Sequence, residues 1–333
     1  MKLIWIAPEC PFPANTGGRI VTWKRLLYLS ERNDIYLYTI IDESCENQYK
    51  TEILKVCREV QMYSRRSFYA IFWKCFFNPY PAVSRWNNDM RKDITQKCRD
   101  IRPDLVVVDF PQMYGVLDVE VIENYTIVLN QHNIEYEALK DVGRAHSQII
   151  KRAVYGGVAK QMEWYEERIY AVNKIALYSF VSISDKKKFE QKNRLYNTCL
   201  APVGAEIGEY PPTVMSRCAV FAAKMSYPAN EAGAKWLVDK VWPVVSKACE
   251  KAELYLVGKE PSEELKKAAA KFSNVTVTGK VDFVDKYYEE CNVVLVPIFN
   301  GGGVKVKLLE ALGHGNRCFQ HLSCPDAATR RCS

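Results

Sequence analysis

A glycine-rich turn between two apolar segments has the residue types best suited to bind an anion. Asn300–Gly303 follows the β-branched run Val293–Ile298 and precedes a run with helical spacing. Backbone N–H groups at the start of a helix have no partner within that helix and favour a phosphate. Lys305 and Lys307 lie in the first turn, where the helix dipole disfavours a cation by about 0.3–1 kcal/mol. A bound anion would remove that conflict.

Two interpretations of this turn stay open. In the first, the glycines and lysines bind a phosphate, and Glu310 reaches a pair of ligand hydroxyls from a helix face otherwise made of Leu and Ala. In the second, the turn is an ordinary loop, and Lys307 is a solvated lysine that pairs with Glu310 three residues on.

A second glycine turn follows the first strand of the chain, which we predict at Lys2–Ala7. Gly17 and Gly18 would let a ligand approach the backbone closely, because neither has a Cβ atom. Their spacing is not GxGxxG and does not predict a dinucleotide site. An ordinary turn between a strand and a helix explains the two glycines equally well.

Two further polar residues lie at the carboxyl ends of predicted strands, where ligands gather in open α/β sheets. Asp109 ends the strand Leu105–Phe110, and His132 follows the strand Thr126–Asn130. Taken alone, a histidine in such a place is more often a hydrogen-bonded structural residue than a ligand contact.

These residues need a scaffold, and the alternation of apolar strands with helices predicts two open α/β domains with parallel sheets. A Pro- and Gly-rich segment separates them, so we expect an N-terminal domain at 1–200, a linker at 201–217 and a C-terminal domain at 218–333. The predicted strands are Lys2–Ala7, Ile35–Ile40, Glu59–Tyr63, Leu105–Phe110, Thr126–Asn130, Leu177–Ser184, Cys218–Ala223, Glu253–Val257, Val275–Gly279 and Val293–Ile298.

We predict the bounds of three helices, together with a cap for one and the exposure of charged residues on another. The segment Ser84–Arg102 is predicted as one helix with Ser84 as its N-cap, and Asn230–Glu250 as another. A long helix at Ile149–Val172 carries four charged residues, most of which we expect to be solvated, namely Glu163, Glu166, Glu167 and Arg168.

Composition excludes several classes of protein. The 333 residues are 48% hydrophobic and 26% charged, which suits a globular chain with two cores, and the net charge of +7 is too diffuse to predict nucleic-acid binding. The sequence predicts neither a transmembrane helix nor a secretory signal. Twelve cysteines without a CxxC pair predict reduced thiols in the cytoplasm, with no disulfide and no zinc.

The segment Arg65–Pro81 (RRSFYAIFWKCFFNPYP) mixes seven aromatic residues with three basic ones. This composition fits a peripheral contact with a membrane, which for a cytoplasmic protein would be its inner face. The alternative is a domain helix that buries its aromatic side chains in the core.

Several motifs together resemble the retaining GT-B glycosyltransferases related to family 4, also called group 1. The resemblance rests on PIFNGGGVKVKLLEALGHG, on FAAKMSYPANEAGAKWLVDKVWPVV at Phe221–Val245, and on the strand ends LYLVGKEP and VTVTGKVD. It implies the GT-B fold, with two Rossmann-like domains facing a cleft. It also implies transfer of a sugar from a nucleotide diphosphate-sugar to a glycan or lipid-linked acceptor, with retention and without metal or other cofactor. Such enzymes build cell-surface polysaccharides or glycolipids.

The resemblance assigns roles to individual residues. Without a metal, the charge on the leaving diphosphate must be stabilised by basic side chains and a helix N-terminus. His132 matches a family histidine near the transferred sugar and is the candidate catalytic residue. The donor-binding candidates are Gly17, Gly18, Lys224, Gly302, Gly303, Lys305, Lys307 and Glu310.

Three features depart from the family pattern. Gly302 stands where many relatives have a glutamate, and Asn230 stands where some have a second basic phosphate ligand. From about Asn316 the sequence no longer matches, which predicts a truncated or frame-shifted, incomplete C-terminal domain of reduced stability. These departures favour an alternative function, a catalytically impaired remnant that binds a nucleotide or a partner without turnover. A GT-B-shaped epimerase would need acid/base groups that the four histidines do not supply.

Overall fold

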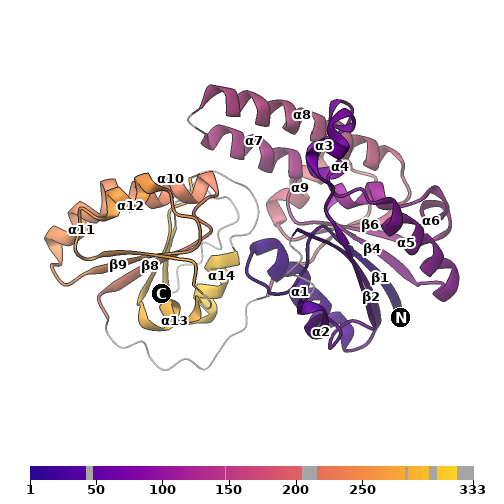
Figure 1. Ribbon diagram of the computed structural model, residues 1–333. Coiled ribbons are helices and arrows are strands. Elements are labelled where there is room, and N and C mark those ends of the chain that lie inside the picture. The colour runs from indigo at the N-terminus through magenta and orange to yellow at the C-terminus, as the bar shows by residue number, and fades with distance from the viewer. Residues whose placement is uncertain (43–47, 147, 205–215, 282–283, 300–305, 321–333) are drawn as a thin grey trace. The chain divides into compact units, whose positions relative to one another are not determined.

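The computed structural model describes residues 1–42, 48–146, 148–204, 216–281, 284–299 and 306–320, and the chain divides into two compact units (Figure 1). Unit 1 comprises Met1–Lys140 and Ala153–Val203, and unit 2 comprises Asp141–Arg152 and Gly204–Ser333. Each unit is built on a parallel sheet with flanking helices, which confirms the predicted α/β class. Most of the predicted linker, residues 205–215, lies outside the described residues.

Unit 1 has a seven-stranded parallel sheet in the order β3-β2-β1-β4-β5-β6-β7. Side chains alternate between two cores, one on each face, so that Ile4 and Ile6 belong to one cluster and Leu3 and Trp5 to the other. Such strands, covered on both faces, explain the nearly continuous apolar runs in the sequence. The strands are β1 (Lys2–Ala7), β2 (Asp34–Ile41), β3 (Glu59–Ser64), β4 (Leu105–Asp109), β5 (Ile127–Gln131), β6 (Ile175–Phe180) and β7 (Thr198–Leu200).

The helical elements of this part of the chain connect the strands. They are α1 (Gly17–Ser30), α2 (Lys50–Ile53), α3 (Phe68–Ile71), η2 (Phe72–Phe76), α4 (Tyr80–Val83), α5 (Asn88–Ile101), η3 (Pro111–Val116), α6 (Val119–Asn124), α7 (Glu135–Ala145), α8 (Ile149–Ala171) and α9 (Ile183–Lys192). None of the helices within the described residues is both long and apolar enough to cross a membrane.

Unit 2 has a five-stranded parallel sheet in the order β10-β9-β8-β11-β12. The predicted rhythm of strand and helix is present throughout its described part. The strands are β8 (Cys218–Ala222), β9 (Glu253–Val257), β10 (Val275–Gly279), β11 (Val293–Val296) and β12 (Arg317–Gln320). The helices are α10 (Pro228–Trp236), the π-helix η4 (Leu237–Val241), α11 (Trp242–Ala248), α12 (Glu263–Ala269), α13 (Asp285–Glu290) and α14 (Val306–Gly313).

In both sheets the order in which the chain adds strands reverses beside the first strand, β1 in unit 1 and β8 in unit 2. In unit 1 the chain runs from β1 outward through β2 and β3, and then returns to the other side of β1 as β4. In unit 2 it runs from β8 through β9 and β10, and then returns beside β8 as β11. The loops at the carboxyl ends of two such strands diverge and leave room for a ligand. These two edges are where the candidate site residues must be sought.

One predicted helix start is wrong. The helix predicted from Ser84 begins instead at α5, because Asn87 caps it by accepting from the backbone N–H groups of Asp89 and Met90 at 2.9 and 3.1 Å. Ser84 is buried and donates to the carbonyl of Pro81 at 3.4 Å.

Two further element boundaries differ from the prediction. Strand β6 ends at Phe180, since the hydroxyl of Ser182 caps α9 by accepting from the Asp185 N–H at 3.1 Å. The single helix predicted at Asn230–Glu250 is α10, η4 and α11 in succession, with Pro243 at the start of α11. Proline has no N–H group to continue the regular ladder of helical hydrogen bonds.

Candidate functional site

The carboxyl edge of the unit 1 sheet brings a histidine and a carboxylate into contact. His132 Nε2 lies 2.8 Å from Asp109 Oδ1, at the ends of the neighbouring strands β5 and β4. Thr22 on α1 donates to Asp109 Oδ2 at 2.5 Å, and the side-chain amide of Asn130 approaches Oδ1 at 3.3 Å. Asp109 is fully buried and His132 is 5% exposed. The two residues predicted separately at strand ends therefore form one buried pair.

The groups around Asp109 stabilise its negative charge. Burial alone would raise the pKa of this carboxyl, but His132, Arg25 and the Thr22 hydroxyl together bring it below its ordinary value. Arg25 is held next to this group on α1, where it donates to the carbonyl of Ala201 at 2.7 Å. Asp109 is consequently a carboxylate at neutral pH, and it fixes the orientation of the imidazole.

Phe110 covers this pair and links it to the first glycine turn. Its ring stacks on His132 with centroids 3.9 Å apart, and its backbone φ is +70°. A Cβ atom added at Gly18 would lie 3.5 Å from the Phe110 ring and 3.1 Å from Glu9 Oε1. The predicted residues Gly17 and Gly18 begin α1 beside the site, and an added Cβ at Gly18 would make an ordinary contact with the Phe110 ring and a tight one with the end of the Glu9 side chain.

One imidazole nitrogen of this site is unused by the protein. His132 Nδ1 is buried and has no hydrogen-bond partner among the residues that the structure describes. Because Nε2 is directed to Asp109, Nδ1 is the imidazole nitrogen that remains available to a ligand.

The carboxyl edge of the unit 2 sheet carries a cluster of two lysines and an asparagine. Lys307 at the start of α14 donates to Asn230 Oδ1 at 3.1 Å, and Asn230 Nδ2 donates to the carbonyl of Lys224 at 2.9 Å. The Lys307 ammonium also lies 5.2 Å from the centre of the Phe221 ring. Lys224 itself is half-exposed and lies 3.6 Å from Glu260. Asn230, which departs from the family pattern, thus connects the two candidate lysines.

Close backbone packing holds the Lys224 loop in place. The N–H groups of Ala223 and Met225 donate to the carbonyls of Val257 and Lys259 at 2.8 and 3.0 Å, so the loops after β8 and β9 run together. Gly258 has φ +144°, and a Cβ atom there would lie 1.7 Å from the Ala223 carbonyl oxygen. The glycine in the LYLVGKEP motif is therefore a structural requirement of the site.

Of the remaining predicted donor-binding residues, the structure describes only Glu310. Glu310 is half-buried on α14. It follows Lys307 by three residues, so the two residues lie on the same side of the helix. Gly302, Gly303 and Lys305 lie outside the described residues.

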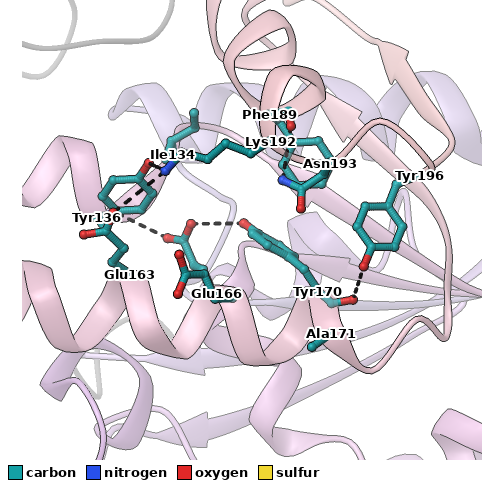
Figure 2. Close-up of a pocket in the computed structure, with 11 residues that line it drawn as sticks. Ile134, Tyr136, Glu163, Glu166, Tyr170, Ala171, Phe189, Lys192, Asn193 and Tyr196 are labelled. Atoms are coloured by element: carbon teal, nitrogen blue, oxygen red, sulfur yellow. Dashed lines mark hydrogen bonds and ion pairs between the residues drawn. The ribbon is translucent and has the colours of Figure 1, made fainter.

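A separate pocket of about 280 Å³ lies among α7, α8 and α9 of unit 1 and contains none of the predicted site residues (Figure 2). Glu166 in its wall is 1% exposed, which corrects the expectation that this residue is solvated. It accepts from the Tyr136 backbone N–H at 3.2 Å and from the Tyr170 hydroxyl at 3.0 Å, and Gln131 donates to that hydroxyl at 2.7 Å. The pocket is lined by Ile134, Tyr136, Glu163, Glu166, Glu167, Tyr170, Ala171, Phe189, Lys192, Asn193 and Tyr196.

Sequence reasoning missed three residues of the unit 1 site. Thr22 and Arg25 are three residues apart on α1, and a polar pair at this spacing on a partly apolar helix was the available signal. Phe110 gave no signal, because an aromatic residue at the end of an apolar strand looks like part of the core.

Part of the chain matches a known protein family. Residues 216–318 match a family described as "Glycosyl transferases group 1". A Klebsiella pneumoniae protein described as an "Uncharacterized 44.6 kDa protein in cps region" is 24% identical over 324 residues, covering 93% of this chain and 80% of that protein.

Solved structures share the fold at low sequence identity. Anabaena HepE in complex with UDP and glucose has a TM-score of 0.60 and 12% identity over 96% of this chain and 80% of that chain. A S. aureus TarM mutant in complex with Fondaparinux, alpha-GlcNAc-glycerol and UDP has a TM-score of 0.64 and 11% identity over 96% of this chain and 85% of that chain. The chain has the GT-B fold of these proteins, and its segment 216–318, which carries Lys224, Asn230 and Lys307, matches the group 1 glycosyl transferases.

Proposed function

We propose that this chain is a retaining, metal-independent glycosyltransferase that moves a sugar from a nucleotide diphosphate-sugar to a glycan or lipid-linked acceptor. The observation that carries the proposal is the cluster of Lys307, Asn230 and Lys224 at the carboxyl edge between β8 and β11, inside the segment that matches the group 1 family. The UDP found with HepE and TarM supports a nucleotide as the ligand.

The chemistry of such a transfer suits these side chains. Negative charge grows on the diphosphate as the glycosidic bond breaks, and cations that contact it stabilise the transition state more than the ground state. Lys307 is partly withdrawn from water beside Phe221, where a charge interaction is stronger than at a solvated position. Lys305, Gly302 and Gly303 would add donors from the same turn, and Glu310 would hold the ribose hydroxyls.

The unit 1 edge supplies the group proposed to act near the transferred sugar. His132 has Nε2 fixed by the Asp109 carboxylate, and its Nδ1 is the atom offered to a sugar hydroxyl. The Phe110 ring shields one face of the imidazole from water. We assign His132 an orienting and sheltering role, with Gly17 and Gly18 allowing the first loop to approach the donor.

The setting of the reaction is part of the same proposal. We place the chain in the cytoplasm, in the synthesis of a cell-surface polysaccharide or glycolipid. The nine cysteines in the described part of the chain are free thiols, and the relative from Klebsiella pneumoniae is described as a protein in the cps region.

Calorimetric titration with UDP, GDP and their sugar conjugates tests the donor site. Lys307→Ala should weaken binding of the preferred nucleotide by about tenfold or more, because a charge-assisted hydrogen bond to phosphate is lost. Lys240→Ala, at an exposed lysine of η4, is the matched control and should bind like the parent chain. Equal affinity of the two variants would refute the assignment.

Product analysis distinguishes an active glycosyltransferase from a catalytically impaired remnant with the same fold. Transfer with retention should appear in the anomeric NMR signals of the product formed from the donor that binds. Nucleotide binding by a folded chain without any transfer or donor hydrolysis would instead support the catalytically impaired remnant.

A further inference from the structure

The segment from α3 to α4 presents its aromatic side chains to solvent. Tyr69, Trp73 and Phe77 are 92%, 78% and 75% exposed, so the alternative that this segment buries its aromatics in the core does not hold. The rings contact one another instead, as in the pairs Phe68–Phe72 and Phe72–Phe76 with centroids 5.6 and 5.3 Å apart. The aromatic surface consists of Phe68, Tyr69, Phe72, Trp73, Phe76, Phe77 and Tyr80.

This aromatic surface is fixed to the unit 1 scaffold. Figure 1 shows α3 and α4 beside α8, and Gln161 of α8 donates to the carbonyl of Cys75 at 3.1 Å. The Arg66 N–H donates to the Ser84 carbonyl at 3.0 Å, and Ile71 is 1% exposed and anchors α3. The backbone is therefore held while the rings stay outside.

The segment that carries the rings has charges of one sign. Residues 65–81 include three basic residues and no acidic one. Arg65 is neutralised by Asp42 at 2.7 Å, which leaves Arg66 and the exposed Lys74. On α8, Trp164 lies one turn from Gln161 and is 48% exposed, with the Arg168 guanidinium 4.6 Å from its ring centre. An aromatic ring and a cation thus continue onto the neighbouring helix, which also carries the exposed Glu167.

We propose that this aromatic surface docks on a lipid bilayer that carries anionic headgroups. Trp, Tyr and Phe combine a large apolar area with a ring quadrupole or a polar tip, and they partition to the headgroup level of membranes. Basic residues beside them gain attraction to an anionic surface. Aromatic residues and arginine are also common in protein–protein interfaces, where lysine is depleted, so Lys74 is the residue that favours the bilayer over a protein partner. The inference goes beyond sugar transfer and does not depend on it.

Flotation of the full chain with vesicles tests the proposal without any nucleotide. The chain should bind phosphatidylglycerol-containing vesicles more tightly than pure phosphatidylcholine vesicles, and the difference should shrink with added salt. Combined replacement of Tyr69, Trp73 and Phe77 by Ala should lower the partition coefficient by about tenfold or more, because three exposed rings no longer enter the interface. Tyr28→Ala is the matched control, since Tyr28 is 74% exposed on α1.

A spectroscopic measurement identifies which surface touches lipid even if the triple variant fails to fold. Brominated lipids should quench tryptophan fluorescence of the parent chain on vesicles, and Trp73→Phe should remove much of that quenching while binding persists. Trp236→Phe is the control, because Trp236 is 39% exposed in unit 2. Quenching that is undiminished in Trp73→Phe would overturn the proposal. So would failure to bind vesicles, or lipid-free self-association that the triple variant abolishes, since the latter would identify a second copy as the occupant.

Discussion

Replacing Glu166 by Gln should make the free energy of unfolding of unit 1 less dependent on pH. Glu166 is 1% exposed in the wall of the pocket among α7, α8 and α9. Its burial, followed by the nearby Glu135 carboxyl, raises the pKa of Glu166 well above its ordinary value, and hydrogen bonds from Tyr170 and Tyr136 offset this only in part. Gln has nearly the same shape, so its amide oxygen can accept from the Tyr136 N–H and its NH2 group can donate to the Tyr170 hydroxyl, but it has no proton to lose.

The sign of the effect follows from proton linkage. Below about pH 4.5 the carboxyl is protonated in both the native and the unfolded chain, so it contributes no pH dependence. Above that pH the unfolded chain releases its proton while the native chain retains it. The free energy of unfolding then falls by up to about 1.4 kcal/mol per pH unit until the raised native pKa is reached. Between pH 5 and pH 7, Glu166→Gln should therefore gain up to about 3 kcal/mol on the parent chain.

The assay must report on unit 1 alone, because the chain has two units. Cys98 is fully buried in the larger core of unit 1, so its alkylation in urea requires unfolding there. The chain is equilibrated in urea at pH 5, 6 and 7, labelled in a brief pulse at one fixed pH, and read by peptide mass spectrometry. Glu167→Gln is the control, since Glu167 is exposed on the same helical turn. Parallel pH profiles for Glu166→Gln and the parent chain would refute the reasoning.

Three further predictions concern a buried carboxylate, a glycine and a helix cap. Asp109→Asn should lower the unfolding free energy of unit 1 by about 3 kcal/mol in the same labelling assay, because Arg25 loses its buried counter-charge, and an unchanged midpoint would contradict this. Since the native pKa of Asp109 is lowered, this stabilisation is complete above about pH 4 and is lost as the pH falls through the native pKa. Gly258→Ala should destabilise unit 2 by about 3 kcal/mol or more. Gly279→Ala, at φ +72° with no atom within 4 Å of the added Cβ, should cost only about 1–2 kcal/mol in urea unfolding. Asn87→Ala should cost about 1 kcal/mol, and no loss in thermal melting would argue against its role as the N-cap.

Much of the fold could be predicted because buried parallel strands appear in the sequence as short apolar runs. The strands Lys2–Ala7, Glu253–Val257 and Val275–Gly279 occur with the predicted bounds. Their burial on both faces leaves a signal that does not depend on distant residues. Helix starts were less predictable, as Ser84 shows, since Ser and Asn are both good caps and tertiary packing selects between them.

The candidate site was predictable only in part. Asp109 and His132 were found because strand ends in such sheets converge, but the hydroxyl of Thr22 reaches Asp109 across 87 residues of sequence. The burial of Glu166 was missed for a related reason. A single glutamate on a long charged helix looks solvated until the packing of α7 and α9 against that turn is known.

The ion pair between Lys224 and Glu260 has a consequence for how the proposed donor site would fill. The Ser226 hydroxyl donates to Glu260 at 2.5 Å, so a carboxylate is held beside Lys224. In the proposed donor site Glu260 would act as an internal placeholder for phosphate, and an arriving diphosphate would exchange with it instead of meeting a lone ammonium. Such an exchange leaves the number of ion pairs at Lys224 unchanged, and it discriminates against monoanions, because only a more highly charged or multidentate ligand gains by displacing a carboxylate. The side chain that competes with the ligand also keeps the lysine ordered for it, which lowers the entropy lost when the ligand binds.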